Sequence, residues 1–275
     1  MNRLALTTIV AAFLLLLPSA ASAKKPTTAR GVQYGKQAGE TATVYSGGSV
    51  PLLLLHEKGE PSGALASKAG YLQSDGFTVF NLEWELAPGK SGIFPFETNQ
   101  IQEAVAYIQG HAAKWSVVPG DLVMVGGSRG ALVAMLAAER ANAIKARSVR
   151  AVASLSGQVN PQASIERARR KELVKVMTGN LAEAFGCEHD LSVCPEAYVR
   201  EWSPLLNVTS NAPAMFLAAA TDERRASAPD QLEMAEALHR HGVQASVVIP
   251  DGGHGYGYWG EVREPLVAFL NVNDK

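Results

Sequence analysis

The sequence predicts an α/β fold with a mostly parallel sheet, helices on both of its faces and a small cap insertion. Apolar runs of strand length, such as residues 51–55 (PLLLL), are typical of strands that are buried on both faces of a parallel sheet. Stretches of helix length separate these runs, and such alternation is typical of parallel sheets. The length of 275 residues suits one α/β domain.

The expected strands are of two kinds. Residues 32–34 and 41–45 are short and partly polar, and residues 41–45 alternate like an edge strand before a Ser-Gly-Gly turn. The other strands are mainly apolar runs, as expected for buried positions in a sheet. They lie at residues 51–55, 76–80, 122–125, 149–155, 214–218 and 244–249.

The expected helices lie between these strands. Residues 97–112 carry apolar side chains on one stripe, and residues 129–140 are apolar nearly all round until Glu139, which is typical of a helix packed deep against a sheet. Further helices are expected at residues 64–74, 229–241 and 259–270. The alternation stops at residues 158–203, a charged and partly helical stretch. We expect this stretch to be a cap insertion at one end of the sheet and not a separate domain.

Residues 1–23 have the pattern of a secretory signal peptide. Arg3 supplies the positive charge, residues 4–17 form the apolar run, and residues 21–23 (ASA) form a small-residue cleavage site. A membrane anchor is the weaker interpretation, because a spanning helix needs about 20 apolar residues. We therefore expect a mature domain of residues 24–275 that begins at Lys24, is secreted or periplasmic and has no stable membrane insertion.

Export favours a disulfide between the two cysteines of the chain, Cys187 and Cys194. The loop-entropy model assigns roughly 2–3 kcal/mol to the closing of so short a loop. A metal site of Cys187, His189 and Cys194 is a weaker alternative, because a fourth ligand and a familiar spacing are both missing. Free buried thiols are the other alternative. We expect no metal and no cofactor.

The charge of the chain argues against some classes of partner. The formal net charge is −1, so no global field favours nucleic acid or an anionic membrane, and we expect no nucleic-acid partner. The oligomeric state is left open. A local basic run in the expected cap is either the solvated side of a helix, which is the more frequent case, or an anion-binding face over a site. Its members are Arg167, Arg169, Arg170, Lys171 and Lys175.

Three loops carry residue types that suit acyl transfer. Ser128 lies in the pentad at residues 126–130 (GGSRG), and Asp222 and His254 follow later in the chain. Each of the three residues comes shortly after one of the expected strands. Because ligands of parallel sheets collect at the carboxyl ends of the strands, we expect these side chains to lie together.

Each residue type meets a chemical requirement. A serine hydroxyl is a poor nucleophile unless a base lies within hydrogen-bond reach, and histidine, with an unperturbed pKa of about 6.5, suits that role. An aspartate on the far ring nitrogen fixes the tautomer and stabilises the imidazolium. Glycines at positions 126 and 130 leave room for a strained strand-to-helix turn.

These motifs resemble those of the α/β-hydrolase superfamily over about residues 50–270. They are most similar to the branch of exported feruloyl- and acetyl-esterase-like enzymes related to prolyl oligopeptidases and dienelactone hydrolases. Besides the pentad, the similar segments are Trp84–Pro88 (WELAP), Phe94-Pro95, Ser203-Pro204, Ala220–Asp222 (ATD) and Gly253–Gly255 (GHG).

This resemblance implies an α/β-hydrolase fold and a function. The implied function is that of a serine hydrolase that cleaves small or carbohydrate-linked acyl esters. Ser128 would be the nucleophile, Asp222 the acid and His254 the base. The implied partner is therefore a small-molecule ester.

The chain departs from the family at the loop after the third expected strand. The family has a His-Gly-Gly-Gly or similar loop there, whose amides build half of the oxyanion hole, whereas this chain has His56-Glu57-Lys58-Gly59. A backbone N–H donates whatever the side chain is. The resemblance therefore implies an oxyanion hole made by the N–H of Lys58 or Glu57 together with that of Arg129. We expect the charged side chains of Glu57 and Lys58 to be solvated.

Several residues offer alternatives to these assignments. Glu223 is the main rival of Asp222 as the acid and Asp230 a weaker one, and Asp222 is favoured because it stands nearer the strand end. Ser156 lacks the glycine two positions before it, so a structural role is expected. The other histidines considered are expected to line the oxyanion loop or to be solvated at helix ends: His56, His111, His239 and His241.

Three functions stay open at this point. The leading one is an ester hydrolase that works through an acyl-enzyme on Ser128. The second is a prolyl-oligopeptidase-like peptidase, although those enzymes usually carry an N-terminal propeller for which 275 residues leave no room. The third is a non-catalytic binding protein that retains the hydrolase fold, since a fold alone does not decide the function.

Overall fold

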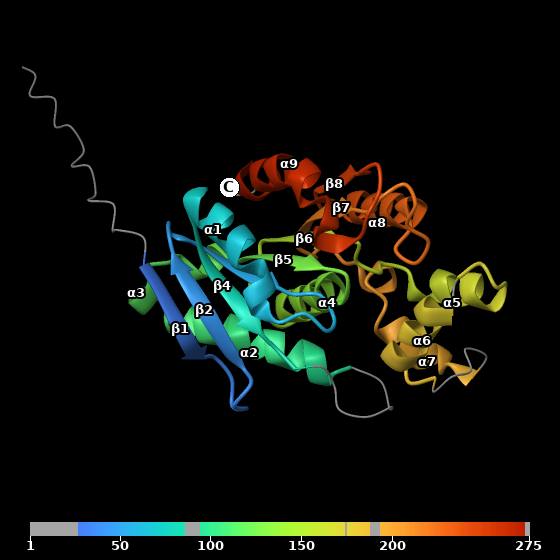
Figure 1. The fold of residues 1–275 in the computed structure, drawn as a ribbon, viewed down its shortest axis with the longest axis horizontal. Coiled ribbons are helices and arrows are strands. Elements are labelled where there is room, and N and C mark those ends of the chain that lie inside the picture. Colours follow the sequence, from blue (N-terminus) through green and yellow to red (C-terminus); the bar gives the residue numbers. More distant parts are fainter. Residues whose placement is uncertain (1–26, 86–93, 174, 188–192, 273–275) are drawn as a thin grey trace, which may run out of the picture.

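A computed structural model describes residues 27–85, 94–173, 175–187 and 193–272 of the chain. Its centre is an eight-stranded sheet in the order β1-β2-β4-β3-β5-β6-β7-β8 (Figure 1). β1 pairs with β2, and β2 with β4, in antiparallel fashion, whereas the other neighbouring strands run parallel. The strands are β1 (Thr27–Gln33), β2 (Thr41–Ser46), β3 (Val50–Leu55), β4 (Phe77–Glu83), β5 (Val123–Gly127), β6 (Ala151–Leu155), β7 (Ala214–Ala218) and β8 (Ala245–Val248). The predicted mostly parallel α/β fold is confirmed.

Helices cover both faces of this sheet. Leu52 and Leu54 of β3 belong to the apolar cluster beneath α1 and α9, whereas Leu53 and Leu55 belong to the cluster beneath α2, α4 and α8. All four leucines are fully buried. Because successive side chains of a strand point to opposite faces, only an unbroken apolar run fills both clusters. The helices are α1 (Ala66–Ser74), α2 (Phe96–Gly110), α4 (Arg129–Ile144), α8 (Ala228–Arg240) and α9 (Trp259–Val272), and α3 (Ala112–Trp115) is one short turn after α2.

Helix α4 is the most deeply packed of these helices. Every residue from Arg129 to Glu139 is buried. The helix follows directly on β5, so its packing against the sheet holds the β5–α4 turn in place. This agrees with the prediction drawn from its apolar sequence.

A separate group of helices is formed by the segment of the chain that connects β6 to β7. It consists of α5 (Pro161–Arg169), α6 (Lys175–Ala184) and α7 (Glu196–Glu201), which lie together to one side of the sheet, away from β1 and β2 (Figure 1). The Asn160 side chain caps α5 by accepting a hydrogen bond of 3.0 Å from the Ala163 N–H. Cys187 and Cys194 form a disulfide with a Cα–Cα distance of 4.6 Å, as predicted, and His189 lies outside the described residues.

The N-terminal predictions are only partly covered. The signal peptide at residues 1–23 and the mature start at Lys24 lie outside the described residues. Within the described ranges, no helix has both the length and the apolar character needed to cross a bilayer.

Strand β1 begins at Thr27, earlier than the expected 32–34, because its polar residues pair through the backbone with β2 from Ser46 onwards. An exposed edge strand gives no apolar signal at those positions.

Candidate active site

Ser128 occupies the sharp turn between β5 and α4. Its backbone has φ 50° and ψ −115°, a conformation that residues with a side chain rarely adopt. A Cβ atom at Gly126 would lie 2.5 Å from the Gly130 carbonyl oxygen, and a Cβ at Gly130 would collide with the His56 carbonyl oxygen. The two glycines of the pentad are therefore required by close backbone approach, as the sequence indicated. The turn lifts the serine hydroxyl above the carboxyl end of the sheet.

A line of hydrogen bonds runs from Ser128 through His254 to Glu223. The distance from Ser128 Oγ to His254 Nε2 is 2.8 Å, and that from His254 Nδ1 to Glu223 Oε1 is 2.6 Å. The Glu223 side chain is 9% exposed and that of His254 is 34% exposed. A carboxylate on Nδ1 selects the tautomer that presents a lone pair on Nε2 to the serine hydroxyl. This arrangement can activate Ser128 as a nucleophile.

The acid in this line differs from the one favoured by the sequence. Asp222 is exposed, and its carboxylate lies about 3.8 Å from where a Cβ on Gly252 would be, outside the line to His254. After β7, Thr221 N–H bonds to Pro250 O and Glu223 N–H bonds to Ala220 O, which closes a turn. That turn directs residue 222 outwards and residue 223 inwards. The preference for Asp222 over Glu223 was wrong in its geometry, because distance along the chain from the strand end does not give the direction of a side chain in a turn.

Asp230, the weaker rival, has another role. Its carboxylate accepts a hydrogen bond of 3.1 Å from Arg167 Nη1 at the start of α8. In the same basic run, Arg170 bonds to Glu172 on the surface. The described contacts of these two arginines are therefore those of structural or surface pairs and not of a face over Ser128.

The segment that carries His254 is held by hydrogen bonds of three buried side chains. Ser156 Oγ accepts a hydrogen bond of 2.9 Å from the Gly255 N–H and lies 2.8 Å from Tyr258 Oη. Tyr256 Oη donates to the Leu55 carbonyl oxygen at 2.9 Å. Burial raises the pKa of both tyrosines, so both stay neutral donors. Ser156 thus has the structural contacts that were expected, whereas nothing in the spacing of the sequence signalled the tyrosines.

Glu57 has a role that the sequence analysis missed. Its Oε1 accepts a hydrogen bond of 2.8 Å from the Tyr256 N–H. The same oxygen would meet a Cβ placed on Gly255 or on Gly127. The expectation of a solvated Glu57 side chain was wrong: the carboxylate fills the space beside two glycines and joins the 56–59 loop to the segment of His254. The signal in the sequence that could have indicated this role is that Glu57, a charged residue, stands at a position where the family has glycine.

The cationic side chains next to this loop are also paired. Lys58 forms an ion pair with Glu183 of α6, and its side chain is only 30% exposed, so it is not simply solvated. The Arg129 guanidinium lies 3.3 Å from Glu97 and 3.6 Å from Glu183. Arg129 is also the first residue of α4, and the N–H groups of a first helical turn have no acceptor within the helix. Its backbone N–H is thus available beside Ser128.

The histidines outside the line are structural or exposed. His56 is buried, stacks on Trp84 with ring centroids 5.0 Å apart, and bonds through Nδ1 to the Glu57 carbonyl oxygen at 2.8 Å. The others lie exposed at helix ends, as expected: His111, His239 and His241. Within the described residues, no cluster of three histidine, cysteine, aspartate or glutamate side chains is arranged to hold a metal ion.

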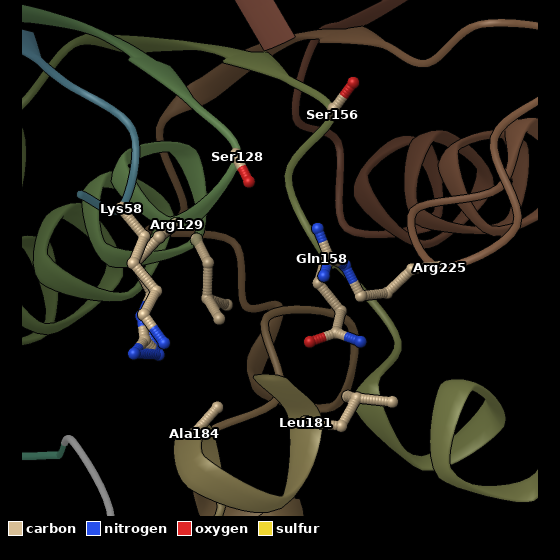
Figure 2. A pocket seen from close by; sticks show the side chains of 9 residues that line it. Lys58, Ser128, Arg129, Ser156, Gln158, Leu181, Ala184 and Arg225 are labelled. Carbon is tan, nitrogen blue, oxygen red and sulfur yellow. The ribbon is translucent and has the colours of Figure 1, made fainter. Parts of the chain in front are cut away.

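A pocket opens beside Ser128. Figure 2 shows Arg225 entering it from the side opposite Lys58 and Arg129, with Gln158 next to the guanidinium and Leu181 and Ala184 of α6 below. Helix α6 therefore forms part of the wall of the pocket. The residues that line it are Lys58, Ser128, Arg129, Leu132, Ser156, Gln158, Leu181, Ala184 and Arg225.

Solved structures share this fold at low sequence identity. A truncated carbohydrate esterase from gut microbiota superposes with a TM-score of 0.70 at 16% identity, over 92% of this chain and 98% of that one. An acetyl ester-xyloside bifunctional hydrolase from Caldicellulosiruptor lactoaceticus gives 0.65 at 16% identity, over 84% and 88%. A Pyrobaculum calidifontis esterase gives 0.69 at 20% identity, over 91% and 85%. These likenesses establish the α/β-hydrolase fold.

A comparison with protein families identifies the chain more closely. No curated protein matches it. Residues 54–237, which make up well over half of the chain and include the pentad and Glu223, match the BD-FAE family. The chain therefore belongs to the BD-FAE family of α/β-hydrolase-like esterase domains.

Proposed function

We propose that this protein is a serine hydrolase that cleaves carboxylic ester bonds through an acyl-enzyme on Ser128. The observation that carries the proposal is the line Ser128–His254–Glu223, with distances of 2.8 Å and 2.6 Å between its polar atoms. Membership of the BD-FAE family supports an ester as the substrate. The position of the serine on a strained turn beside a pocket supports its role as the nucleophile.

The proposed reaction has two halves. In the first, Ser128 Oγ attacks the ester carbonyl carbon while its proton moves to His254 Nε2, and Glu223 stabilises the imidazolium. The bond to the alcohol then breaks, and the alcohol leaves with that proton. In the second half, a water molecule attacks the acyl carbon and gives a proton to His254. The carboxylic acid leaves, and the serine oxygen regains its proton.

Backbone amides are proposed to stabilise the oxyanion. The Arg129 N–H at the start of α4 is one donor, and the positive end of the helix dipole adds to it. The N–H of Lys58 or Glu57 is the second. The contacts of their side chains with Glu183 and Tyr256 support this assignment, because they fix the backbone of the loop.

Small or carbohydrate-linked acyl esters are the proposed substrates. The pocket is lined in part by the apolar side chains of Leu132, Leu181 and Ala184, which suits a small acyl or aryl group. Two of the structural neighbours are described as a carbohydrate esterase and an acetyl ester-xyloside hydrolase, which supports this class for the present chain.

Labelling and kinetics test this proposal together. A fluorophosphonate probe should label the wild-type protein on Ser128, and p-nitrophenyl acetate should be hydrolysed. Ser128→Ala should lose labelling and at least about 10⁴-fold in kcat/KM, with an unchanged thermal unfolding midpoint. A variant that keeps a tenth of the wild-type kcat/KM would exclude Ser128 as the nucleophile.

The two other functions give different results in the same experiments. A prolyl-oligopeptidase-like peptidase would be labelled but would cleave peptide amides with a kcat/KM comparable to that for esters. A non-catalytic binding protein would be neither labelled nor active. No feature of the described residues favours either one over the esterase.

Export of the protein is proposed on the basis of the N-terminal sequence and is supported by the disulfide. Intact mass spectrometry of the protein from its native host should give a chain that begins at Lys24 with Cys187 and Cys194 bonded. A full-length chain, or two free thiols after oxidising isolation, would contradict export.

A further inference from the structure

The pocket beside Ser128 contains three cationic side chains that differ in their partners. Lys58 pairs with Glu183, and Arg129 pairs with Glu97 and Glu183. Arg225 also lines the pocket, yet its guanidinium forms no ion pair or hydrogen bond with the described residues. One of the three cations therefore has no direct ion-pair partner among the described residues.

Arg225 is placed to meet a bound substrate. It follows Glu223 by two residues, and Figure 2 shows its guanidinium directed into the pocket that opens beside Ser128. The residue is half-buried, and burial lowers its pKa, while Glu223 and Glu57 oppose this effect and Arg129 adds to it. A guanidinium nevertheless remains charged in a protein. A desolvated charge without a partner is unfavourable, so an anion in the pocket would be stabilised there.

Gln158 supplies a second unsatisfied donor at the same place. Its side chain is 8% exposed, and its Nε2 has no hydrogen-bond acceptor among the described residues. It lines the pocket next to Arg225, as Figure 2 shows. Buried polar groups normally have partners, so the unpartnered Gln158 Nε2 beside a guanidinium without a direct ion pair points to an acceptor from outside the chain.

We propose that Arg225 and Gln158 form a subsite for a carboxylate, so that the ester cleaved at Ser128 carries a negative charge close to the scissile bond. This inference rests on the proposed esterase function and narrows its substrate class. A guanidinium donates two parallel hydrogen bonds to a carboxylate, and the amide adds a third.

Matched pairs of esters measure this preference directly. Monomethyl glutarate against methyl butyrate places the charge on the acyl side, and 4-acetoxybenzoate against phenyl acetate places it on the alcohol side. For at least one pair, the wild-type enzyme should have the larger kcat/KM for the charged ester. The pair that shows the preference identifies the side of the scissile bond on which the subsite lies.

Variants then assign the preference to residues. Arg225→Gln should lower the charged-to-neutral ratio of kcat/KM by about 10- to 100-fold, mainly through KM, because a hydrogen bond to a charged group is lost. Arg225→Lys should keep part of the ratio, since it keeps the charge but not the paired geometry. Gln158→Ala should lower the ratio by about fivefold. The control is Arg224→Gln, an exposed neighbour whose guanidinium bonds to the Glu172 carbonyl oxygen, and it should change the ratio by less than about twofold.

Several outcomes would overturn this inference. A wild-type ratio of one or less for both pairs excludes the subsite, whatever the variants do. Equal losses on charged and neutral esters in Arg225→Gln would make Arg225 a support for Glu223. A wild-type protein that neither reacts with the fluorophosphonate nor hydrolyses phenyl acetate would refute the proposed function itself. Ser128-dependent hydrolysis of phenyl acetate without charge preference would refute only the subsite.

Discussion

The two walls of the pocket beside Ser128 handle charge in opposite ways. The loop wall consists of residues 56–59 and the first turn of α4, and its cations are paired with Glu97 and Glu183. The arginine wall consists of Gln158 and Arg225: the buried Gln158 Nε2 has no hydrogen-bond partner, and the Arg225 guanidinium forms no direct ion pair, among the described residues. The comparison suggests a division of labour: paired charges fix the geometry of the nucleophile and the oxyanion hole, and unpaired donors are left for the substrate.

The largest expected effect concerns the line that both walls flank. Glu223→Ala should lower kcat for p-nitrophenyl acetate by about 10³–10⁴-fold, because His254 loses the group that fixes its tautomer and stabilises its charge. Asp222→Ala, one residue earlier, should lower it by less than about threefold because its side chain is exposed. The reverse order of the two losses would restore Asp222 as the acid.

This pair of residues also marks a limit of prediction from sequence. The strand order and the glycine-flanked serine followed from patterns that backbone periodicity and steric crowding impose. The histidine was placed because a loop after the last parallel strand must lie at the same edge of the sheet. The acid was misplaced by one residue, because its direction depends on the hydrogen bond from Glu223 N–H to Ala220 O. No sequence period predicts that turn.

The next effect tests the loop wall as a positioning device. Glu57→Ala should lower kcat for neutral esters by about 10- to 100-fold, because the Tyr256 N–H loses its acceptor and the neighbouring His254 can shift. Glu57→Gln keeps an oxygen acceptor and should recover most of the activity. Equal losses in both variants would mean that the negative charge, and not the position of His254, is what matters.

Glu57 shows a second reason why sequence arguments fell short. A Glu-Lys pair in place of family glycines was read as a solvated, charged entrance to the site. The reading failed because the partners of Glu57 and Lys58, Tyr256 and Glu183, lie far away in the chain. The same holds for Arg225, whose lack of a partner is a three-dimensional fact. Residue type and spacing locate a loop at the site, but only tertiary contacts decide which of its charges are free.

A smaller effect on the charged-to-neutral ratio of kcat/KM is expected when a cation of the loop wall loses its carboxylate partner. Glu183→Gln removes the carboxylate shared by Lys58 and Arg129, so Lys58 becomes available to a bound anion, whereas Arg129 keeps its pair with Glu97. The charged-to-neutral ratio of kcat/KM should then rise by about three- to tenfold, and the rise should shrink as salt screens the exposed charges. The control is Glu201→Gln on α7, which removes the exposed ion-pair partner of Arg140 and should leave the ratio unchanged. A ratio that stays constant in Glu183→Gln would show that Lys58 does not face the bound ester.

The smallest effect is expected from Lys58 itself. Its N–H is a candidate oxyanion donor, but a backbone donor does not depend on the side chain, and its ion pair with Glu183 is partly exposed on both sides. Exposed ion pairs contribute about 0.2–1 kcal/mol, which corresponds to a change of less than about fivefold. Lys58→Ala should therefore lower kcat for phenyl acetate by no more than that factor, whereas loss of one oxyanion donor costs about 10²–10³ in kcat. A loss above a hundredfold with an intact fold would place the Lys58 ammonium group in the catalytic machinery, and the loop wall would then contribute a charge to the reaction as well as its backbone.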